Sequence, residues 1–134
     1  MLWVNEVADL DAVVRLPALQ HFSATLPTPG MSLKALRGAP ALRQLSLWWG
    51  TPPQVLTGIG RYLPQLETLD LSGEVTQALD AVRDLKRLRS LTLRADGSLD
   101  LRPLRGMNLR LRLLHADEYL GLDELGPGVK VSYD

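Results

Sequence analysis

One spacing of apolar residues recurs along the chain and constrains its fold more than any other feature. Two leucines lie three residues apart, a third follows after three more, and a fourth after two. The clearest copies are Leu63, Leu66, Leu69, Leu71 and Leu85, Leu88, Leu91, Leu93. Looser copies occupy 16–24 and 39–47, where smaller or aromatic apolar residues replace some leucines. Repetition at intervals near 20 residues is typical of stacked supersecondary units.

The last two members of each copy predict a β-strand. In Leu-x-Leu the two leucines point to the same side, because side chains alternate along a strand, and the residue between them faces the other way. The first members of these pairs are Leu2, Phe22, Leu45, Leu69, Leu91, Leu111 and Val129, with separations of 20, 23, 24, 22, 20 and 18 residues. We therefore expect seven strands, each with one apolar and one exposed side.

Between the strands the apolar spacing becomes helical. Apolar residues in 75–85 recur at intervals of 4, 3 and 3, which predicts an amphipathic helix. A weaker helix is expected at 55–63, after two prolines that suit a helix start, and further helices at 7–15 and 32–38. A strand-turn-helix unit cannot bury its leucine side alone, so successive units are expected to stack with parallel strands side by side.

Two segments resemble a known repeat family. LPQLETLDLSG at 63–73 and LKRLRSLTLRA at 85–95 are similar to leucine-rich repeats, whose pattern is L-x-x-L-x-L-x-x-N/C-x-L. The resemblance implies an α/β fold: a leucine-rich-repeat solenoid, or right-handed βα superhelix, with a parallel sheet on the concave face and short helices on the convex face. The length of 134 residues indicates a single domain over 1–134, which the resemblance describes as leucine-rich-repeat-like with about six to seven repeats.

The chain departs from this pattern at the Asn/Cys position, which holds Gly50, Glu74 and Asp96 in the central copies. In the family an asparagine there bonds the backbone of the turn. Another group must therefore satisfy those backbone amides, either a side chain such as that of Asp96 or a short helical turn.

Composition excludes several classes of function. The chain has no cysteine, which excludes disulfides, thiolate catalysis and cysteine-ligated metals. Fifteen basic and fifteen acidic residues leave no net charge to attract nucleic acid or an acidic membrane. The acidic first dozen residues do not resemble a signal peptide, and no apolar run approaches the roughly 20 residues of a membrane span. We expect a cytoplasmic protein, and twelve arginines against three lysines favour a GC-rich bacterial source.

The predicted strands arrange their outward residues in rows. The central row is Trp3, Ser23, Ser46, Asp70, Thr92, Arg112 and Lys130. The next is Asn5, Thr25, Trp48, Ser72, Arg94, Leu114 and Ser132, and the row before is His21, Gln44, Thr68, Ser90, Arg110 and Gly128. Because Trp48 and Trp49 are adjacent, Trp48 is expected to face outward, and Trp49 inward or in the turn.

Five outward residues are the candidates for binding a partner: Trp48, Asp70, Arg94, Arg110 and Arg112. Tryptophan is a frequent interface anchor, and arginine binds carboxylate or phosphate through its planar guanidinium. Two alternatives remain open. Trp48 could be a half-buried packing residue, and the carboxylates of Asp96, Asp117 and Glu118 could neutralise the arginines on a solvated surface.

Catalysis has little support in the sequence. His21 and His115 belong to distant repeats and have no second ligand at metal-binding spacing, and Asp70 has no accompanying nucleophile. The G-x-G of 58–60 lacks the rest of a dinucleotide fingerprint. We therefore expect neither an enzyme nor a cofactor or metal site.

The leading hypothesis is a noncatalytic protein-protein interaction module that binds a protein partner on the concave sheet face. One alternative is a structural or oligomerising segment of a larger repeat protein. Others are a stand-alone bacterial adaptor or a toxin-neutralising (immunity) protein. Neither end of the chain resembles a full polar cap, so end-to-end self-association is a further alternative.

Overall fold

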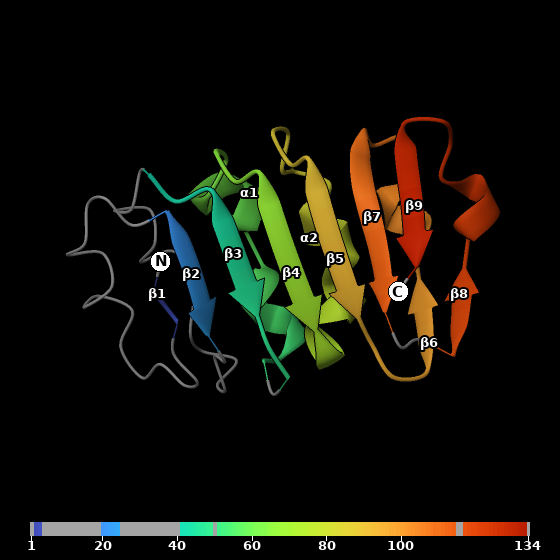
Figure 1. The fold of residues 1–134 in the computed structure, drawn as a ribbon, viewed down its shortest axis with the longest axis horizontal. Helices are drawn as coiled ribbons and strands as arrows, with labels where there is room; N and C mark the ends of the chain where they lie inside the picture. Colours follow the sequence, from blue (N-terminus) through green and yellow to red (C-terminus); the bar gives the residue numbers. More distant parts are fainter. Residues whose placement is uncertain (1, 4–19, 25–40, 50, 115–116, 134) are drawn as a thin grey trace.

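Seven parallel strands form the main sheet of the protein. The computed structural model describes residues 2–3, 20–24, 41–49, 51–114 and 117–133 (Figure 1). The strands are β1 (Leu2–Trp3), β2 (His21–Ala24), β3 (Gln44–Leu47), β4 (Thr68–Ser72), β5 (Ser90–Arg94), β7 (Leu109–Leu114) and β9 (Val129–Tyr133). They lie in this order across the sheet, and each pair of neighbours is parallel. The fold is therefore mixed α/β with one mainly parallel sheet.

The register of six strands is the one that the Leu-x-Leu pairs predict. Phe22 lies opposite Leu2 and Leu45, and the line of partners continues through the first leucine of each pair to Leu111. The prediction is wrong for β9, where Val131 lies opposite Leu111 and Val129 opposite Leu109. A shift of two residues keeps every side chain on its own face, so the alternating pattern cannot distinguish the two registers.

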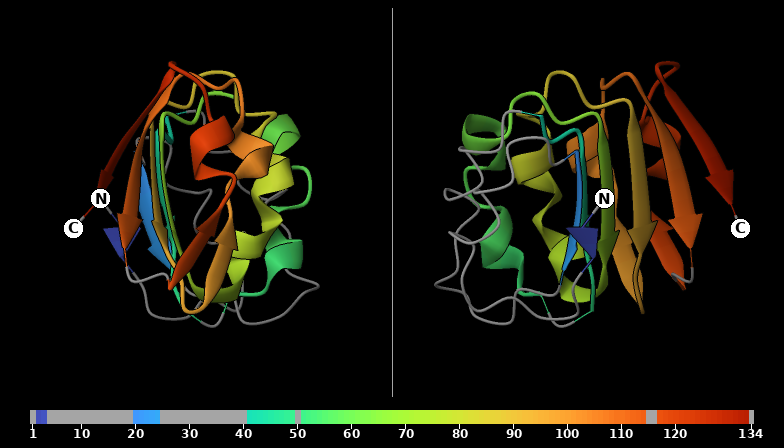
Figure 2. Two further views of the ribbon diagram at one scale, coloured as in Figure 1. Left: turned by 90° about the vertical axis from the view of Figure 1, so that its right-hand side faces the viewer. Right: turned by 60° about the vertical axis from the view of Figure 1, so that its left-hand side comes forward.

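Two connections between strands are helical. The chain passes from β3 to β4 through the 3-10 helix η3 (Pro53–Leu56) and the α-helix α1 (Ile59–Tyr62). From β4 to β5 it passes through η4 (Gly73–Ala78) and α2 (Leu79–Val82). These helices lie on one face of the main sheet (Figure 2).

The continuous helices expected at 55–63 and 75–85 are therefore wrong in form, because each segment is a 3-10 helix followed by a single α-helical turn. Gly58, with φ of 80°, interrupts the first of them. The valine, leucine and isoleucine side chains of both segments are nevertheless buried. The helical spacing thus identified the buried side correctly, although not the type of helix.

Two further connections contain strands, which the sequence did not predict. After β5 the chain returns through β6 (Ser98–Asp100) and η5 (Arg102–Leu104), and after β7 through β8 (Glu118–Leu120) and η6 (Leu122–Glu124). β6 and β8 pair in parallel as a second, two-stranded sheet. In Figure 1 their arrows point opposite to those of the main sheet.

The length of each connection explains its conformation. Matching positions are 24 residues apart from β3 to β4 and 22 from β4 to β5, but only 20 from β5 to β7 and from β7 to β9. An extended residue advances about 3.3 Å, against about 1.5 to 2.0 Å in a helix. A connection with fewer residues therefore reaches the start of the next strand only if part of it is extended.

The core fills the space between the main sheet and its connections. It is one cluster in which the leucines of the strands meet those of the connections, and most of its members are fully buried. Burying a leucine side chain contributes about 1.5 to 3 kcal/mol. The repeated leucine is thus the main source of stability.

A short helical turn takes the place of the missing asparagine after β4. Glu74 is exposed, and η4 starts at Gly73, whose φ of 88° suits glycine. The buried Thr76 hydroxyl donates to the Gly73 carbonyl at 2.7 Å. A helical turn is one of the two alternatives that the sequence left open, although the Thr76 bond pairs a carbonyl oxygen and not a turn amide.

Some expectations fall outside the described residues: the helices at 7–15 and 32–38, the loop at 25–30, and His115. Within the described part, no helix has the length and apolar character that crossing a bilayer requires.

Candidate functional site

The candidate site lies on the face of the main sheet opposite the helices, which we call the open face (Figure 2). The alternation in β7 illustrates it: Leu109, Leu111 and Leu113 are buried, whereas Arg110 and Arg112 are exposed. The register places the central row of this face side by side: Ser23, Ser46, Asp70, Thr92, Arg112 and Ser132. Lys130 lies opposite Arg110 instead, because of the different register of β9.

A hydrogen-bond network occupies one part of the open face. The Ser23 Oγ lies 3.0 Å and the Ser46 Oγ 3.4 Å from Nε2 of His21. The Ser46 hydroxyl donates to Oδ2 of Asp70 at 3.1 Å. Burial lowers the pKa of His21 below its usual value of 6.5, although the nearby charge of Asp70 acts in the opposite direction. The neutral imidazole can thus accept a hydrogen bond from Ser23 at neutral pH.

This network does not have the geometry of a hydrolase. Both serines are buried, and the carboxylate of Asp70 accepts from Ser46 rather than orienting the imidazole. Nucleophilic catalysis needs an accessible hydroxyl, a base, and a third group that orients the base. The network is better explained as polar packing that holds Asp70 in place.

A hollow of about 150 Å³ lies on the open face near the ends of β3, β4, β5 and β7. We call it the open-face hollow. Its lining residues are Trp48, Asp70, Leu71, Ser72, Thr92, Arg94, Arg112 and Leu114.

The hollow brings together four of the five residues predicted to bind a partner: Trp48, Asp70, Arg94 and Arg112. Arg110 lies apart from them, exposed and opposite Ser90 and Lys130. Ser72 and Thr92 also line the hollow, and sequence analysis placed them in the outward rows without selecting them. Their register with Arg94 and Arg112 was the signal that could have identified them.

Two nitrogen atoms of the hollow are buried without a hydrogen-bond partner among the described residues: Nε1 of Trp48 and Nε of Arg94. Leaving a buried donor unpaired costs about 1 to 3 kcal/mol. Such donors are rare in native proteins, and each one needs an explanation. Here both belong to residues that line the same small hollow.

Two of the acidic side chains that were expected to neutralise the arginines of the open face, Glu118 and Asp96, lie elsewhere. Glu118 accepts a hydrogen bond from the Ser98 hydroxyl at 3.1 Å, between β8 and β6. Asp96 lines a different hollow, together with Trp49 and Glu74. The structure gives neither of them a contact with Arg94.

The ion pairs of the described residues include two at the start of the strands, where Glu67 lies 3.6 Å from Arg43 and 3.9 Å from Arg89. A third joins Arg102 to Asp100 at 2.8 Å. This arginine lowers the pKa of Asp100 to about 2, mainly through its side-chain hydrogen bonds. These pairs lie away from the open-face hollow.

The two adjacent tryptophans have different surroundings. Trp48 is half-buried and lines the open-face hollow. Trp49 lies in the turn after β3 and is 44% exposed. Its ring packs over Gly73, where an added Cβ would come within 2.8 Å of it. Trp49 therefore covers the turn after β4, and of these two adjacent tryptophans Trp48 is the one on the open face.

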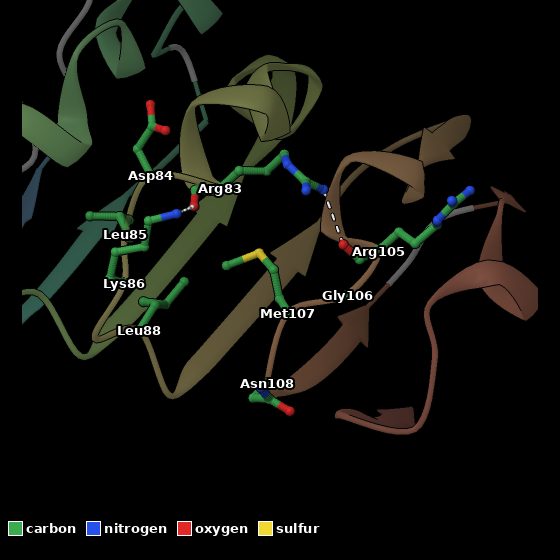
Figure 3. A pocket seen from close by; sticks show the side chains of 9 residues that line it. All are labelled: Arg83, Asp84, Leu85, Lys86, Leu88, Arg105, Gly106, Met107 and Asn108. Atoms are coloured by element: carbon green, nitrogen blue, oxygen red, sulfur yellow. Dashed lines mark hydrogen bonds between the residues drawn. The ribbon is translucent and has the colours of Figure 1, made fainter.

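A hollow of about 350 Å³ lies between the connections rather than on the open face (Figure 3). The guanidinium of Arg83 extends across it and donates to the carbonyl oxygens of Pro103 and Arg105. Lys86 donates to the carbonyl of Arg83 at 3.4 Å. Arg83 thus joins its own connection to the next one, which is a structural role, whereas the Lys86 bond stays within a single connection.

No metal centre is evident in the described part of the chain, because no three His, Asp or Glu side chains there are grouped closely enough to hold an ion. Comparisons with protein-family models, with curated proteins and with solved structures found no match. The function of the candidate site must therefore be inferred from its geometry alone.

Proposed function

We propose that the protein is a noncatalytic interaction module of the leucine-rich-repeat type, which binds a protein partner on the open face. In this proposal the chain winds as a right-handed βα solenoid whose concave side is the open face. Seven sequential parallel strands, with the described helices on one face, support the winding. Crossover connections between parallel strands are right-handed in about 98% of cases.

The observation that carries the proposal is the composition of the open-face hollow. It combines Trp48, Arg94 and Arg112 in one place, and tryptophan and arginine are among the residues most enriched at binding hot spots. Arg94 and Arg112 lie in paired strands, which hold their backbone rigidly. Little ordering entropy is then lost on binding, so a few anchor side chains suffice for affinity.

The test compares proteins captured by three forms of the immobilised chain. These are the unmodified protein, the Arg94→Gln/Arg112→Gln double variant, and Arg87→Gln, a control at an exposed arginine outside the hollow. Extracts of the organism that encodes the chain are passed over each form, and retained proteins are quantified by mass spectrometry. We expect the double variant to retain the partner at least about tenfold less, equivalent to 1.4 kcal/mol.

The control variant should capture as much partner as the unmodified protein, and circular dichroism should confirm that all three forms are folded. Equal capture by all three forms would mean that the open-face hollow is not the binding site.

A second function, self-association, is favoured by the β9 end of the sheet. In the described part of the chain, β9 has a partner strand on one side only. Tyr133 and Leu120 at this end are 59% and 39% exposed. An open strand edge with exposed apolar side chains can pair with a strand of another chain.

Sedimentation velocity at increasing concentration tests self-association. We expect a dimer that the Leu120→Glu/Tyr133→Glu variant does not form. A protein that stays monomeric at the highest concentration would rule out this second function.

A further inference from the structure

The open-face hollow has the size of a single side chain. Its volume is about 150 Å³, whereas pockets for metabolites and cofactors usually measure about 300 to 1,000 Å³. A protein cavity of about 150 Å³ holds one benzene-sized group. The hollow is thus too small for a nucleotide or a drug-sized molecule, and large enough for one side chain of a partner.

Beside the Asp70 carboxylate and the hydroxyls of Ser72 and Thr92, three lining side chains favour a ligand that accepts hydrogen bonds. The indole nitrogen of Trp48 and the guanidinium nitrogens of Arg94 and Arg112 are donors only. Nε1 of Trp48 and Nε of Arg94 are already removed from solvent without an acceptor among the described residues. An acceptor that reaches both atoms would offset the cost of their burial.

The formal charge of the lining residues favours a carboxylate over a phosphoryl group as the acceptor. Two guanidinium groups and the carboxylate of Asp70 give a formal charge of +1. A carboxylate of charge −1 balances this value, whereas a phosphoryl group carries −1.5 to −2 near neutral pH. Asp70 already accepts a hydrogen bond from Ser46, which helps to hold it as a fixed negative group.

We propose that the open-face hollow is an anchor pocket for one carboxylate side chain, an aspartate or glutamate of the protein partner. Arginine binds a carboxylate through two parallel hydrogen bonds, which are stronger than bonds between neutral groups. Arg94 and the Trp48 indole together bind the carboxylate oxygens, and Arg112 adds its charge. Both unpaired nitrogens are buried from solvent, so the carboxylate can reach them only after the side chains of Trp48 and Arg94 rotate. Changes of side-chain rotamer are common at interfaces. This inference rests on the proposed function.

The experiment uses the full chain labelled with ¹⁵N and two small probes. N-acetylglutamate α-amide presents a single side-chain carboxylate, and N-acetylglutamine α-amide has the same shape without the charge. The readouts are the Nε1–H signal of Trp48, assigned with Trp48→Phe, and the Nε–H signal of Arg94, assigned with Arg94→Lys. Both atoms are the unpaired donors themselves.

We expect N-acetylglutamate amide to shift both signals in a saturable way and to leave the indole signal of Trp49 in place. The glutamine probe should shift neither signal at the same concentrations. Arg94→Gln should weaken binding of the acidic probe at least about tenfold, equivalent to 1.4 kcal/mol, whereas Arg87→Gln should bind it normally.

Three results would overturn the inference: equal shifts with both probes, no shift at the solubility limit of the acidic probe, or tighter binding of inorganic phosphate. Each can be distinguished from failure of the proposed function. If the capture experiment depends on Arg94 and Arg112 but the acidic probe fails, the module binds a partner by another chemistry. If the probe binds but capture does not depend on these arginines, the pocket selects carboxylates but the proposed partner-binding role is wrong.

Discussion

At the residue scale, Arg94 is the clearest case of a side chain whose burial should cost stability. Its Nε is buried without an acceptor among the described residues, although Ser72 and Leu114 lie directly beside it in the neighbouring strands. Proteins usually satisfy buried polar groups, and the exceptions concentrate at functional sites. A residue kept for binding should therefore be replaceable without loss of stability.

Arg94→Met tests this expectation. Methionine keeps the length of the side chain and removes the unpaired donor, so we expect the free energy of unfolding to rise by on the order of 1 kcal/mol. Urea denaturation measures the change. The matched control Arg87→Met, at an exposed position, should stay within about 0.5 kcal/mol. A clear loss of stability in Arg94→Met alone would assign Arg94 a structural role.

We expect His21 to make the stability of the protein depend on pH. Burial lowers its pKa below 6.5 in the folded protein, so the unfolded chain takes up a proton first as the pH falls. Stability should be highest above about pH 6.5 and should decrease on acidification toward the lowered pKa. Urea midpoints measured across this range should fall for the unmodified protein and fall less for His21→Gln. An equal decrease in both would exclude His21 as the cause.

At the element scale, α1 shows how closely successive connections pack. Gly60 lies inside this helix, and a Cβ there would meet Cβ of Asp84 and would lie 2.9 Å from the backbone C and O of Asp84. The next connection thus contacts the helix backbone directly. This close approach explains a glycine at a position where helix propensity favours alanine.

Gly60→Ala should therefore destabilise the protein by about 1 to 3 kcal/mol, as expected for overpacking. In an isolated helix the same change stabilises by about 1 kcal/mol, so the sign distinguishes the two effects. Thermal and urea unfolding measure it. Gly97→Ala is a useful comparison, because its site is open and has φ of 75°, so its cost comes from backbone strain alone. A stabilised Gly60→Ala variant would contradict the packing argument.

The strands could be predicted from sequence far better than the connections. Leu-x-Leu specifies the face of a strand through period-two alternation and leaves only registers that differ by two residues. From Leu2 to Leu111 the first members of the pairs are indeed partners. The predicted register of β9 was wrong because Val129 and Val131 are equivalent in an alternating pattern. The strands β6 and β8 were missed because their conformation depends on the length that each connection must span.

The candidate site was predictable to the extent that it depends on strand register. Trp48, Asp70, Arg94 and Arg112 were identified from their rows, and the structure places them around one hollow. The burial of Nε1 and Nε could not be predicted, because it depends on side-chain rotamers that the spacing of residues does not specify. For the same reason the network of His21, Ser23 and Ser46 was not foreseen.

At the scale of the whole molecule, each strand of the main sheet pairs only with its neighbours in the described order. Stability in such stacked arrangements is approximately a sum of unit and nearest-neighbour contributions. Local opening should therefore be easiest at an end of the stack and hardest in its centre.

Amide hydrogen exchange should show this gradient. We expect the slowest exchange in β4 and β5, which have strands on both sides and fully buried leucines. Exchange should be faster in β9, which pairs with β7 alone among the described strands and becomes exposed toward Tyr133. Mass spectrometry of peptic fragments can resolve these elements. Uniform protection from β4 to β9 would indicate a single cooperative unit instead.

The change from helices to strands in the connections also affects curvature. Packed helices are about 8 to 10 Å apart, whereas paired strands are about 4.8 Å apart. The main sheet should therefore curve where α1 and α2 pack on the face opposite the open face. It should be flatter where the paired strands β6 and β8 take the place of helices. On the open face we therefore expect a concave region beside Trp48 and a flatter region at Arg110 and Lys130, which lie side by side. The surface of the proposed partner should be complementary to both regions.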